Sequence, residues 1–298
     1  MTQVFREGVA ATDPAYINLR DSDSDPARAA RELTESLWLR YSPYADDHFL
    51  DCIPHEFDER FWEMYLTCSL LELGFDVHCP KPGPDILIEA DGGRVWIEAV
   101  TPTSGALGHP DAIPEPQFGK AGRVPEEQIL LRMRSAIQGK YETKYREYRD
   151  KGVIGPDDSY VVAVNGCQLH HAIADDYPPW IAKAVFPIGG LQVALDRESL
   201  EVAETSYQYR GVVEKCSGSS VSTDIFLDQD YRDLSGVLYS KVDAGNPTAR
   251  MGDDFILVHN PLANMPLDAG LLGCGKELAV RVEGDHGVIE DTDWNSRA

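Results

Sequence analysis

Long apolar runs are missing from this sequence. No eighteen consecutive residues are apolar, so we expect no membrane-spanning helix and no membrane partner. The first sixteen residues lack the apolar core of a secretory signal peptide. The six cysteines include no C-x-x-C pair, and the eight histidines include no H-E-x-x-H pattern. We therefore expect reduced thiols, no disulfide framework, no zinc site and a cytoplasmic location.

Positive charge is also scarce. The chain has 27 Lys and Arg against 50 Asp and Glu, a net charge of −23. Residues 1–119 carry a net charge of −14 and residues 152–298 a net charge of −13, whereas residues 120–151 carry +4. Such acidity repels nucleic acid at long range, so any nucleic-acid binding is expected to be weak or assisted by a partner. No internal repeat, low-complexity tract or glycine-rich phosphate loop is present.

The most informative segment contains a predicted β-hairpin. Two apolar runs, residues 86–88 and 95–100, flank Asp91-Gly92-Gly93, a turn sequence typical of hairpins. Asp85 begins the first run and Glu98 lies inside the second, so we expect their carboxylates to lie near each other across paired strands. Converging carboxylates bind Mg²⁺ or Mn²⁺, which prefer oxygen ligands.

These two acidic residues also have an ordinary interpretation. Asp85 follows Pro84, and aspartate after proline is common in turns. Glu98 would then be a solvated side chain on its strand. Both interpretations remain open at this point.

The flanking residues predict alternating helices and strands. Residues 60–74 have apolar side chains at helical spacing and end at a glycine. Residues 75–77 are expected to form a strand, and residues 125–152 a long helix that begins with Pro-Glu-Glu. Residues 159–165 form a further apolar run that predicts a buried strand. The glycine- and proline-rich segment 101–122 is expected to be a long loop.

This order of elements resembles the PD-(D/E)XK nuclease superfamily, which has the restriction-endonuclease-like fold. The resemblance covers about residues 57–165 and implies an α/β fold with an αβββαβ core and a mixed central sheet. It also implies that Asp85 and Glu98 bind the catalytic Mg or Mn, and that Glu63 on the first helix adds or orients a ligand.

The sequence departs from the family at one catalytic position. The family's lysine stands two residues after the glutamate, on the same strand face, and here that residue is Val100. Some family members carry the cation on the next helix, and this chain has Lys140 and Lys144 on one face of that helix. Lys140 is the preferred replacement because apolar residues precede it on a similar face. Alternatively, both lysines are ordinary surface cations.

Tyrosines alternate with basic residues along the same helix. An aromatic and basic face of this kind can stack on nucleic-acid bases. We instead expect Tyr141, Tyr145 and Tyr148 to pack against the protein, with their charged neighbours extended toward solvent.

Extensions are expected on both sides of the core. Residues 1–50 should form an irregular tail, over residues 1–25, and then a helix near residues 26–40. Residues 51–170 should form the nuclease-like core. Residues 171–298 should form a strand-rich extension that continues the core sheet or builds a small second domain. Strands are expected in that extension at residues 191–195, 224–227, 237–241 and 255–259.

The leading functional hypothesis is a metal-dependent phosphodiesterase that acts on nucleic acid through Asp85 and Glu98, with Lys140 as its cation. The alternative is a catalytically inactive nuclease-fold protein that serves as a binding or assembly module, which Val100 and the strong acidity favour. A third hypothesis, an enzyme for small substrates, is based only on loop 101–122 as a lid.

Overall fold

The computed structural model describes residues 3–90, 93–117, 119–283 and 286–297. The predicted hairpin turn therefore lies partly outside the described residues, at Asp91 and Gly92. The α-helices are α1 (Pro14–Asp21), α2 (Asp25–Tyr41), α3 (Phe49–Cys52), α4 (Phe57–Glu72), α5 (Glu126–Gly139), α6 (Arg146–Asp150) and α7 (Trp180–Val185). A π-helical segment, η1 (Lys140–Tyr145), joins α5 to α6. Short 3₁₀ helices are η2 (Ala172–Ala174), η3 (Ile225–Leu227), η4 (Gln229–Tyr231) and η5 (Asn295–Arg297).

An eight-stranded mixed sheet forms the centre of the molecule, with strand order β1-β2-β3-β4-β9-β10-β11-β12. Strands β1 to β3 are antiparallel, β3, β4 and β9 run parallel, and β10 and β11 form a second parallel pair. The strands are β1 (Asp76–His78), β2 (Ile86–Ala90), β3 (Gly93–Val100), β4 (Ser159–Asn165), β9 (Gly236–Ser240), β10 (Ile256–His259), β11 (Lys276–Glu283) and β12 (His286–Asp293). The protein is thus mixed α/β.

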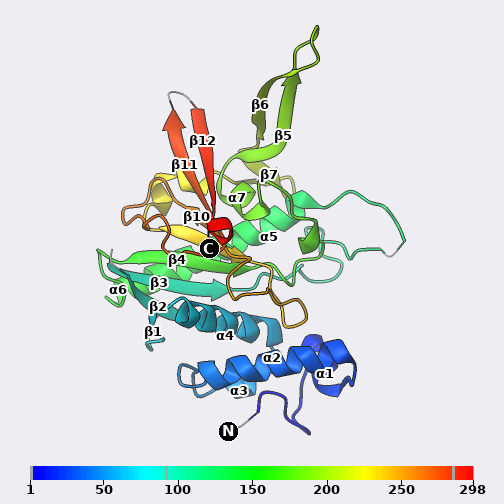
Figure 1. The fold of residues 1–298 in the computed structure, drawn as a ribbon, viewed down its shortest axis with the longest axis vertical. Helices are drawn as coiled ribbons and strands as arrows, with labels where there is room; N and C mark the ends of the chain where they lie inside the picture. Colours follow the sequence, from blue (N-terminus) through cyan, green and yellow to red (C-terminus); the bar gives the residue numbers. More distant parts are fainter. Residues whose placement is uncertain (1–2, 91–92, 118, 284–285, 298) are drawn as a thin grey trace.

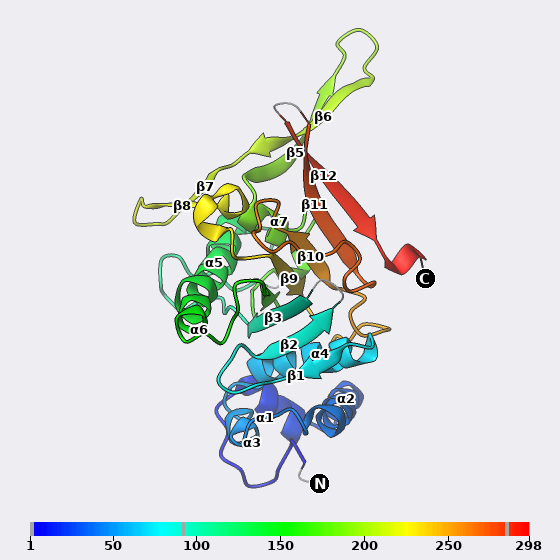
Figure 2. The same cartoon turned by 90° about the vertical axis from the view of Figure 1, so that its left-hand side faces the viewer.

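Helices cover both faces of this sheet (Figure 1). Helix α4 lies on one face, with α1 to α3 packed outside it, and α5 and α7 lie on the other face, as the view in Figure 2 also shows. The side chains of β3 alternate between the two layers: Val95 and Ile97 join the cluster under α4, whereas Trp96 joins the cluster under α5. This alternation follows from the period of two in a strand, and it determines which β3 residues can meet α5 and η1.

The N-terminal tail is more ordered than its composition predicts. We expected residues 1–25 to be irregular, but α1 forms there because the Asp13 side chain accepts hydrogen bonds from the backbone N–H groups of Ala15 and Tyr16. Tyr16 is fully buried and donates from its hydroxyl to the carbonyl oxygen of Val4. The helix expected at residues 26–40 is present as α2, with Ser24 as its N-cap.

The C-terminal extension contains more strands than were predicted. Strands β9 to β12 join the same sheet as β1 to β4. The predicted strand at residues 224–227 is wrong: Ile225 and Phe226 are adjacent, both are buried, and they lie in the 3₁₀ helix η3. Two further pairs of strands lie outside the main sheet: β5 (Ile188–Leu195) with β6 (Val202–Tyr209), and β7 (Val212–Glu214) with β8 (Ser220–Ser222).

Three further findings concern the cysteines, loop 101–122 and the lengths of the helices. The six cysteines are free. The described part of loop 101–122 contains no helix or strand. Within the described ranges, no helix is both long enough and apolar enough to cross a membrane.

Candidate functional site

Asp85 and Glu98 meet at the end of the β2–β3 ladder. The last pair in the register is Ile86 with Ile97, so Asp85, just before β2, and Glu98, just after that pair, face each other. The Asp85 carboxylate accepts a hydrogen bond from the backbone N–H of Ala99 at 2.8 Å. Both carboxylates line the same cavity, and the charge of Asp85 acts on Glu98.

A tight turn leads the chain into this position. The turn at residues 80–84 approaches β3 closely, and a Cβ atom at Gly83 would lie 2.9 Å from the carbonyl oxygen of Pro80 and 3.1 Å from the Trp96 ring. Only glycine fits this approach without displacement of neighbouring atoms. The glycine thus helps to place Asp85 at the end of the ladder.

Glu98 is a buried carboxylate paired with Lys140. Its side chain is 4% exposed, and Lys140 Nζ lies 2.8 Å from its Oε1. Among the described residues, Oε2 of Glu98 is buried and has no hydrogen-bond partner. Burial and then the charge of Asp85 raise the pKa of Glu98 to about 7, although Lys140 opposes this shift. Burial lowers the pKa of Lys140, but the Glu98 carboxylate, together with Asp85 and Glu59, more than offsets this, and the net shift is upward.

Glu63 reaches the same site from α4. Its Oε1 accepts a hydrogen bond from the Tyr41 hydroxyl at 2.8 Å, and its Oε2 lies 3.0 Å from the guanidinium of Arg60. Burial, followed by the charge of Asp85, raises the pKa of Glu63, while Tyr41 and Arg60 oppose the shift. Glu63 is thus held by two partners that were not predicted to belong to the site.

The π-helical segment η1 orients the basic side chains toward this site. Tyr141 and Tyr145 are buried, and their rings stack with centroids 5.1 Å apart. Tyr145 also contacts Tyr160 of β4, at a centroid distance of 4.9 Å. This packing confirms the expectation that these two tyrosines pack against the protein. π-helical turns occur often at functional sites, and here the turn carries Lys140 and Lys144.

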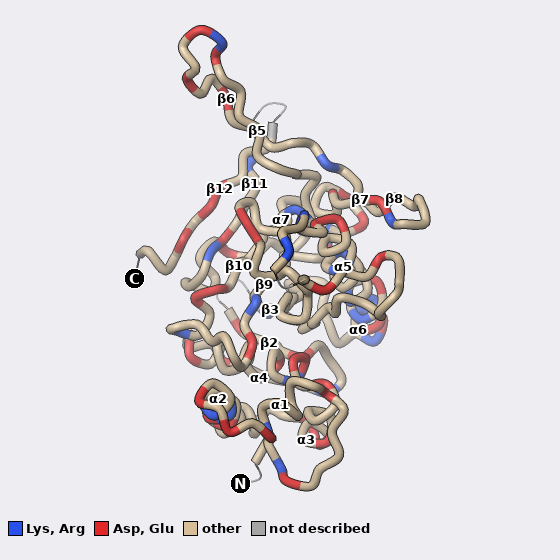
Figure 3. The backbone as a smooth tube through the Cα atoms, turned by 90° about the vertical axis from the view of Figure 1, so that its right-hand side faces the viewer, with Lys and Arg blue, Asp and Glu red and all other residues tan. Residues whose placement is uncertain are grey.

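Glu63, Asp85, Glu98 and Lys140 line a polar cavity of about 350 Å³. Five acidic and five basic side chains surround it, in a chain whose net charge is −23. The acidic residues are Glu59, Glu63, Asp85, Glu98 and Glu147, and the basic residues are Arg60, Lys81, Lys140, Lys144 and Lys151. Tyr148 completes one wall, where burial, Glu98 and Asp85 raise its pKa to about 12. Figure 3 shows basic positions near α6 and many acidic positions along the rest of the backbone.

The donor atoms at this cavity fit a hard divalent cation. Asp85 and Glu98 offer carboxylate oxygens, and the buried Oε2 of Glu98 is without a hydrogen-bond partner in the described chain. However, within the residues that the structure describes, no three His, Cys, Asp or Glu side chains are grouped so that they could hold a metal together. Val100, where the nuclease resemblance predicts a lysine, packs against the apolar cluster under α5.

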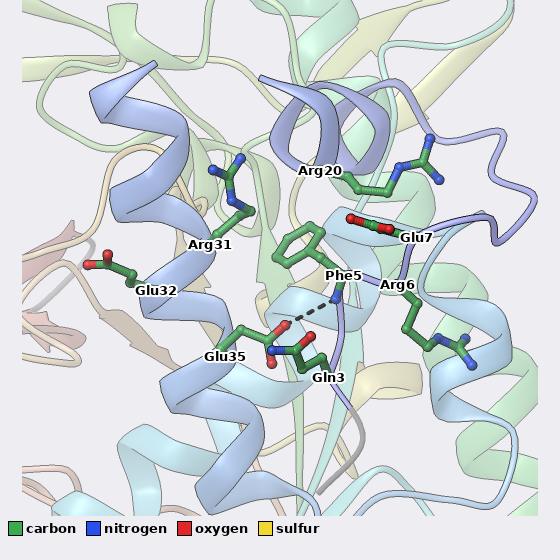
Figure 4. A pocket seen from close by; sticks show the side chains of 8 residues that line it. All are labelled: Gln3, Phe5, Arg6, Glu7, Arg20, Arg31, Glu32 and Glu35. Atoms are coloured by element: carbon green, nitrogen blue, oxygen red, sulfur yellow. Dashed lines mark hydrogen bonds between the residues drawn. The ribbon is translucent and has the colours of Figure 1, made fainter. Parts of the chain in front are cut away.

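A larger cavity of about 820 Å³ lies at the N-terminal helices and contains none of the predicted site residues (Figure 4). Several of its ionic groups make contacts within the protein. Glu35 accepts hydrogen bonds from the backbone N–H groups of Val4 and Phe5, and Arg31 donates to carbonyl oxygens at the end of α1. Arg20 is paired with Asp21. The hydrogen bonds of Glu35 therefore hold the N-terminal segment against α2.

Comparison with models of protein families, with curated proteins and with solved structures finds no match for this chain.

Proposed function

We propose that this chain is a metal-dependent phosphodiesterase of the nuclease type, built on a restriction-endonuclease-like core. The core would consist of α4, β1, β2, β3, α5 and β4. In support, these elements follow one another in the order αβββαβ. Their four strands are neighbours in the sheet, three antiparallel and the fourth parallel to β3.

One observation carries the functional proposal: Asp85, Glu98 and Lys140 converge in a single polar cavity although 42 residues separate Glu98 from Lys140. Asp85 and Glu98 would hold Mg²⁺ or Mn²⁺, and Glu63 would assist. Such an ion, when bound, lowers the pKa of water and neutralises charge on a phosphate. Lys140 would take the place of the family's lysine, which Val100 does not supply, and would donate to a phosphate oxygen.

Nuclease assays of charge-neutral variants test this proposal. We expect Mn²⁺-dependent cleavage of labelled DNA or RNA oligonucleotides to fall about 100-fold or more in Asp85→Asn and in Glu98→Gln, because each variant removes a ligand charge while it keeps the side-chain shape. Glu198→Gln, at an exposed acidic residue, is the matched control and should retain full activity. Equal cleavage by all four proteins would contradict the proposed mechanism.

A second candidate function is a non-catalytic binding or assembly module on the same fold. Two observations favour it: Val100 at the lysine position, and the absence of a three-residue metal-ligand group among the described residues. This candidate predicts that Mn²⁺ does not bind at Glu98. The heat measured by titration of Mn²⁺ should then be the same for the unmodified chain and for Glu98→Gln. Saturable Mn²⁺ binding together with cleavage would rule it out.

A further inference from the structure

Lys140 forms an ion pair with Glu98, the carboxylate that would bind the proposed metal. Its ammonium group is 2.8 Å from Glu98 Oε1, and its side chain is 22% exposed. A divalent cation at Glu98 and the Lys140 ammonium would therefore repel each other at the same carboxylate. The arrangement raises the question of what Lys140 would contact when a metal is bound.

Two other ammonium groups at the cavity lack partners. Lys81, in the turn before β2, and Lys144, in η1, both line the cavity. Across the described residues, neither forms an ion pair within 4 Å nor a side-chain hydrogen bond, whereas Lys151 is paired with Glu147. The positive charge of Lys144 opposes the rise in the pKa of Glu98, and the positive charge of Lys81 opposes the rise in the pKa of Glu63. An anion in this cavity would meet unpaired positive charge beside Lys140.

We propose that Lys81, Lys144 and Lys140 form a phosphate subsite, and that phosphate and a divalent cation bind cooperatively because the phosphate draws Lys140 away from Glu98. This inference rests on the proposed function, since it assumes that Glu98 is a metal ligand. It adds a coupling to that function: the Lys140 ammonium weakens metal binding at Glu98 until a phosphate group draws it away.

The physical basis is the cost of an unpaired buried charge. If the metal alone displaced Lys140, the ammonium would lose its partner in a largely buried position. If a phosphate alone drew Lys140 away, the Glu98 carboxylate, which is 4% exposed, would be left unpaired. When both ligands bind, Lys140 pairs with the phosphate and Glu98 pairs with the metal. Each ligand therefore strengthens the binding of the other, and the coupling is reciprocal.

Metal-binding measurements test this coupling without an activity assay. Mn²⁺ is titrated by calorimetry into the full chain with and without thymidine 5′-monophosphate, and the affinity of Mn²⁺ for the nucleotide alone is measured separately and subtracted. We expect the nucleotide to strengthen Mn²⁺ binding about tenfold, within the range usual for coupled sites. Reciprocally, Mn²⁺ should strengthen nucleotide binding by the same factor.

Lysine variants distinguish the role of Lys140 from general charge effects. Lys140→Met should bind Mn²⁺ about tenfold more tightly than the unmodified protein without nucleotide, and the nucleotide should no longer strengthen that binding. Lys144→Met should leave Mn²⁺ binding without nucleotide within about twofold and should weaken the nucleotide effect. Lys215→Met, at an exposed lysine of the β7–β8 turn, is the matched control and should behave as the unmodified protein.

The outcomes separate failure of the inference from failure of the proposed function. If Mn²⁺ binds with one affinity with and without nucleotide, and Glu98→Gln abolishes that binding, the metal site stands and the coupling is wrong. If neither the unmodified protein nor Lys140→Met binds Mn²⁺ with the nucleotide present, both are wrong. Lys140→Gln, which keeps a polar side chain next to Glu98, is measured alongside so that misfolding of Lys140→Met does not decide the result.

Discussion

Buried or half-buried carboxylates with raised pKa values occur both inside and outside the candidate site. Burial is the largest cause at Glu98 and Glu63, and it is also the largest cause at Asp175, far from that cavity in the sequence. The pKa of Asp175 is raised to about 6, although a hydrogen bond from the backbone N–H of Trp180 at 2.8 Å opposes the shift. A raised pKa alone therefore does not identify a functional residue in this chain.

Asp175 gives a testable pH dependence. Its folded-state pKa of about 6 lies above its ordinary value of 3.8, so the folded state binds the proton more tightly than the unfolded state does. The contribution of Asp175 to the free energy of unfolding should therefore fall as pH rises from about 4 to about 6, by up to about 3 kcal/mol for a shift of this size. Asp175→Asn keeps an acceptor for Trp180 and should remove this decrease.

Urea denaturation at several pH values between 4 and 8 measures the effect. The difference in unfolding free energy between Asp175→Asn and the unmodified protein should grow as pH rises and level off above about pH 6. Asp230→Asn, at an exposed aspartate, should run parallel to the unmodified protein. A constant difference across the whole pH range would contradict the raised pKa.

The candidate site was only partly predictable from the residues. The sequence placed Asp85 and Glu98 together because a short hairpin and a period of two fix neighbours locally. No local sequence pattern indicates the hydrogen bond between Tyr41 and Glu63, because the two residues lie on different helices and meet only after α2 packs on α4. Arg60 stands three residues before Glu63, so helical spacing would have indicated that pair.

At the scale of elements, composition explains which predictions succeeded. Strand β4 was predicted with its observed bounds, because its central residues are apolar and the whole strand is buried. Strands β11 and β12 were missed since they carry many charged residues on the outer part of the sheet, where alternation is weak. The long helix before β4 was predicted, but the π-helical turn within it was not, because it depends on tyrosine packing against β4 and η4.

The β5–β6 hairpin projects from the end of the molecule opposite the N-terminal helices (Figures 1 and 2). It exposes apolar side chains: Leu191 is 57% exposed, Val193 50% and Leu195 53%. Side chains with this exposure contribute little to the free energy of unfolding of a monomer. We therefore expect the double variant Val193→Thr/Leu195→Thr to change the free energy of unfolding by less than about 0.5 kcal/mol.

A buried valine provides the contrast for this prediction. Val162 in β4 is fully buried, and Val162→Thr places a hydroxyl in the apolar cluster under α5, at a cost of about 1–3 kcal/mol. Both variants are compared by urea denaturation at low protein concentration. A loss above about 1 kcal/mol in the hairpin variant would show that its apolar face is covered in solution.

At the scale of the whole molecule, the charge distribution sets how a nucleic acid would approach. The cavity has equal numbers of acidic and basic side chains, whereas the chain as a whole carries −23. A polyanion approaching from a distance therefore meets net repulsion before any lysine of the cavity can contact a phosphate. This is the reverse of the usual nucleic-acid-binding protein, in which a basic surface accelerates encounter.

This opposition predicts an unusual salt dependence. Salt between about 20 and about 150 mM shortens the screening length to about 8 Å and so weakens the long-range repulsion. The association rate constant for a single-stranded DNA oligonucleotide, measured by stopped-flow fluorescence, should therefore rise over this range, whereas it falls for a basic protein. A peptide nucleic acid of the same base sequence has no backbone charge, and its association rate should not change. A rate constant for DNA that falls with salt would mean that the lysines around the cavity control encounter despite the net charge, and that the local field, rather than the total charge, governs access to Asp85 and Glu98.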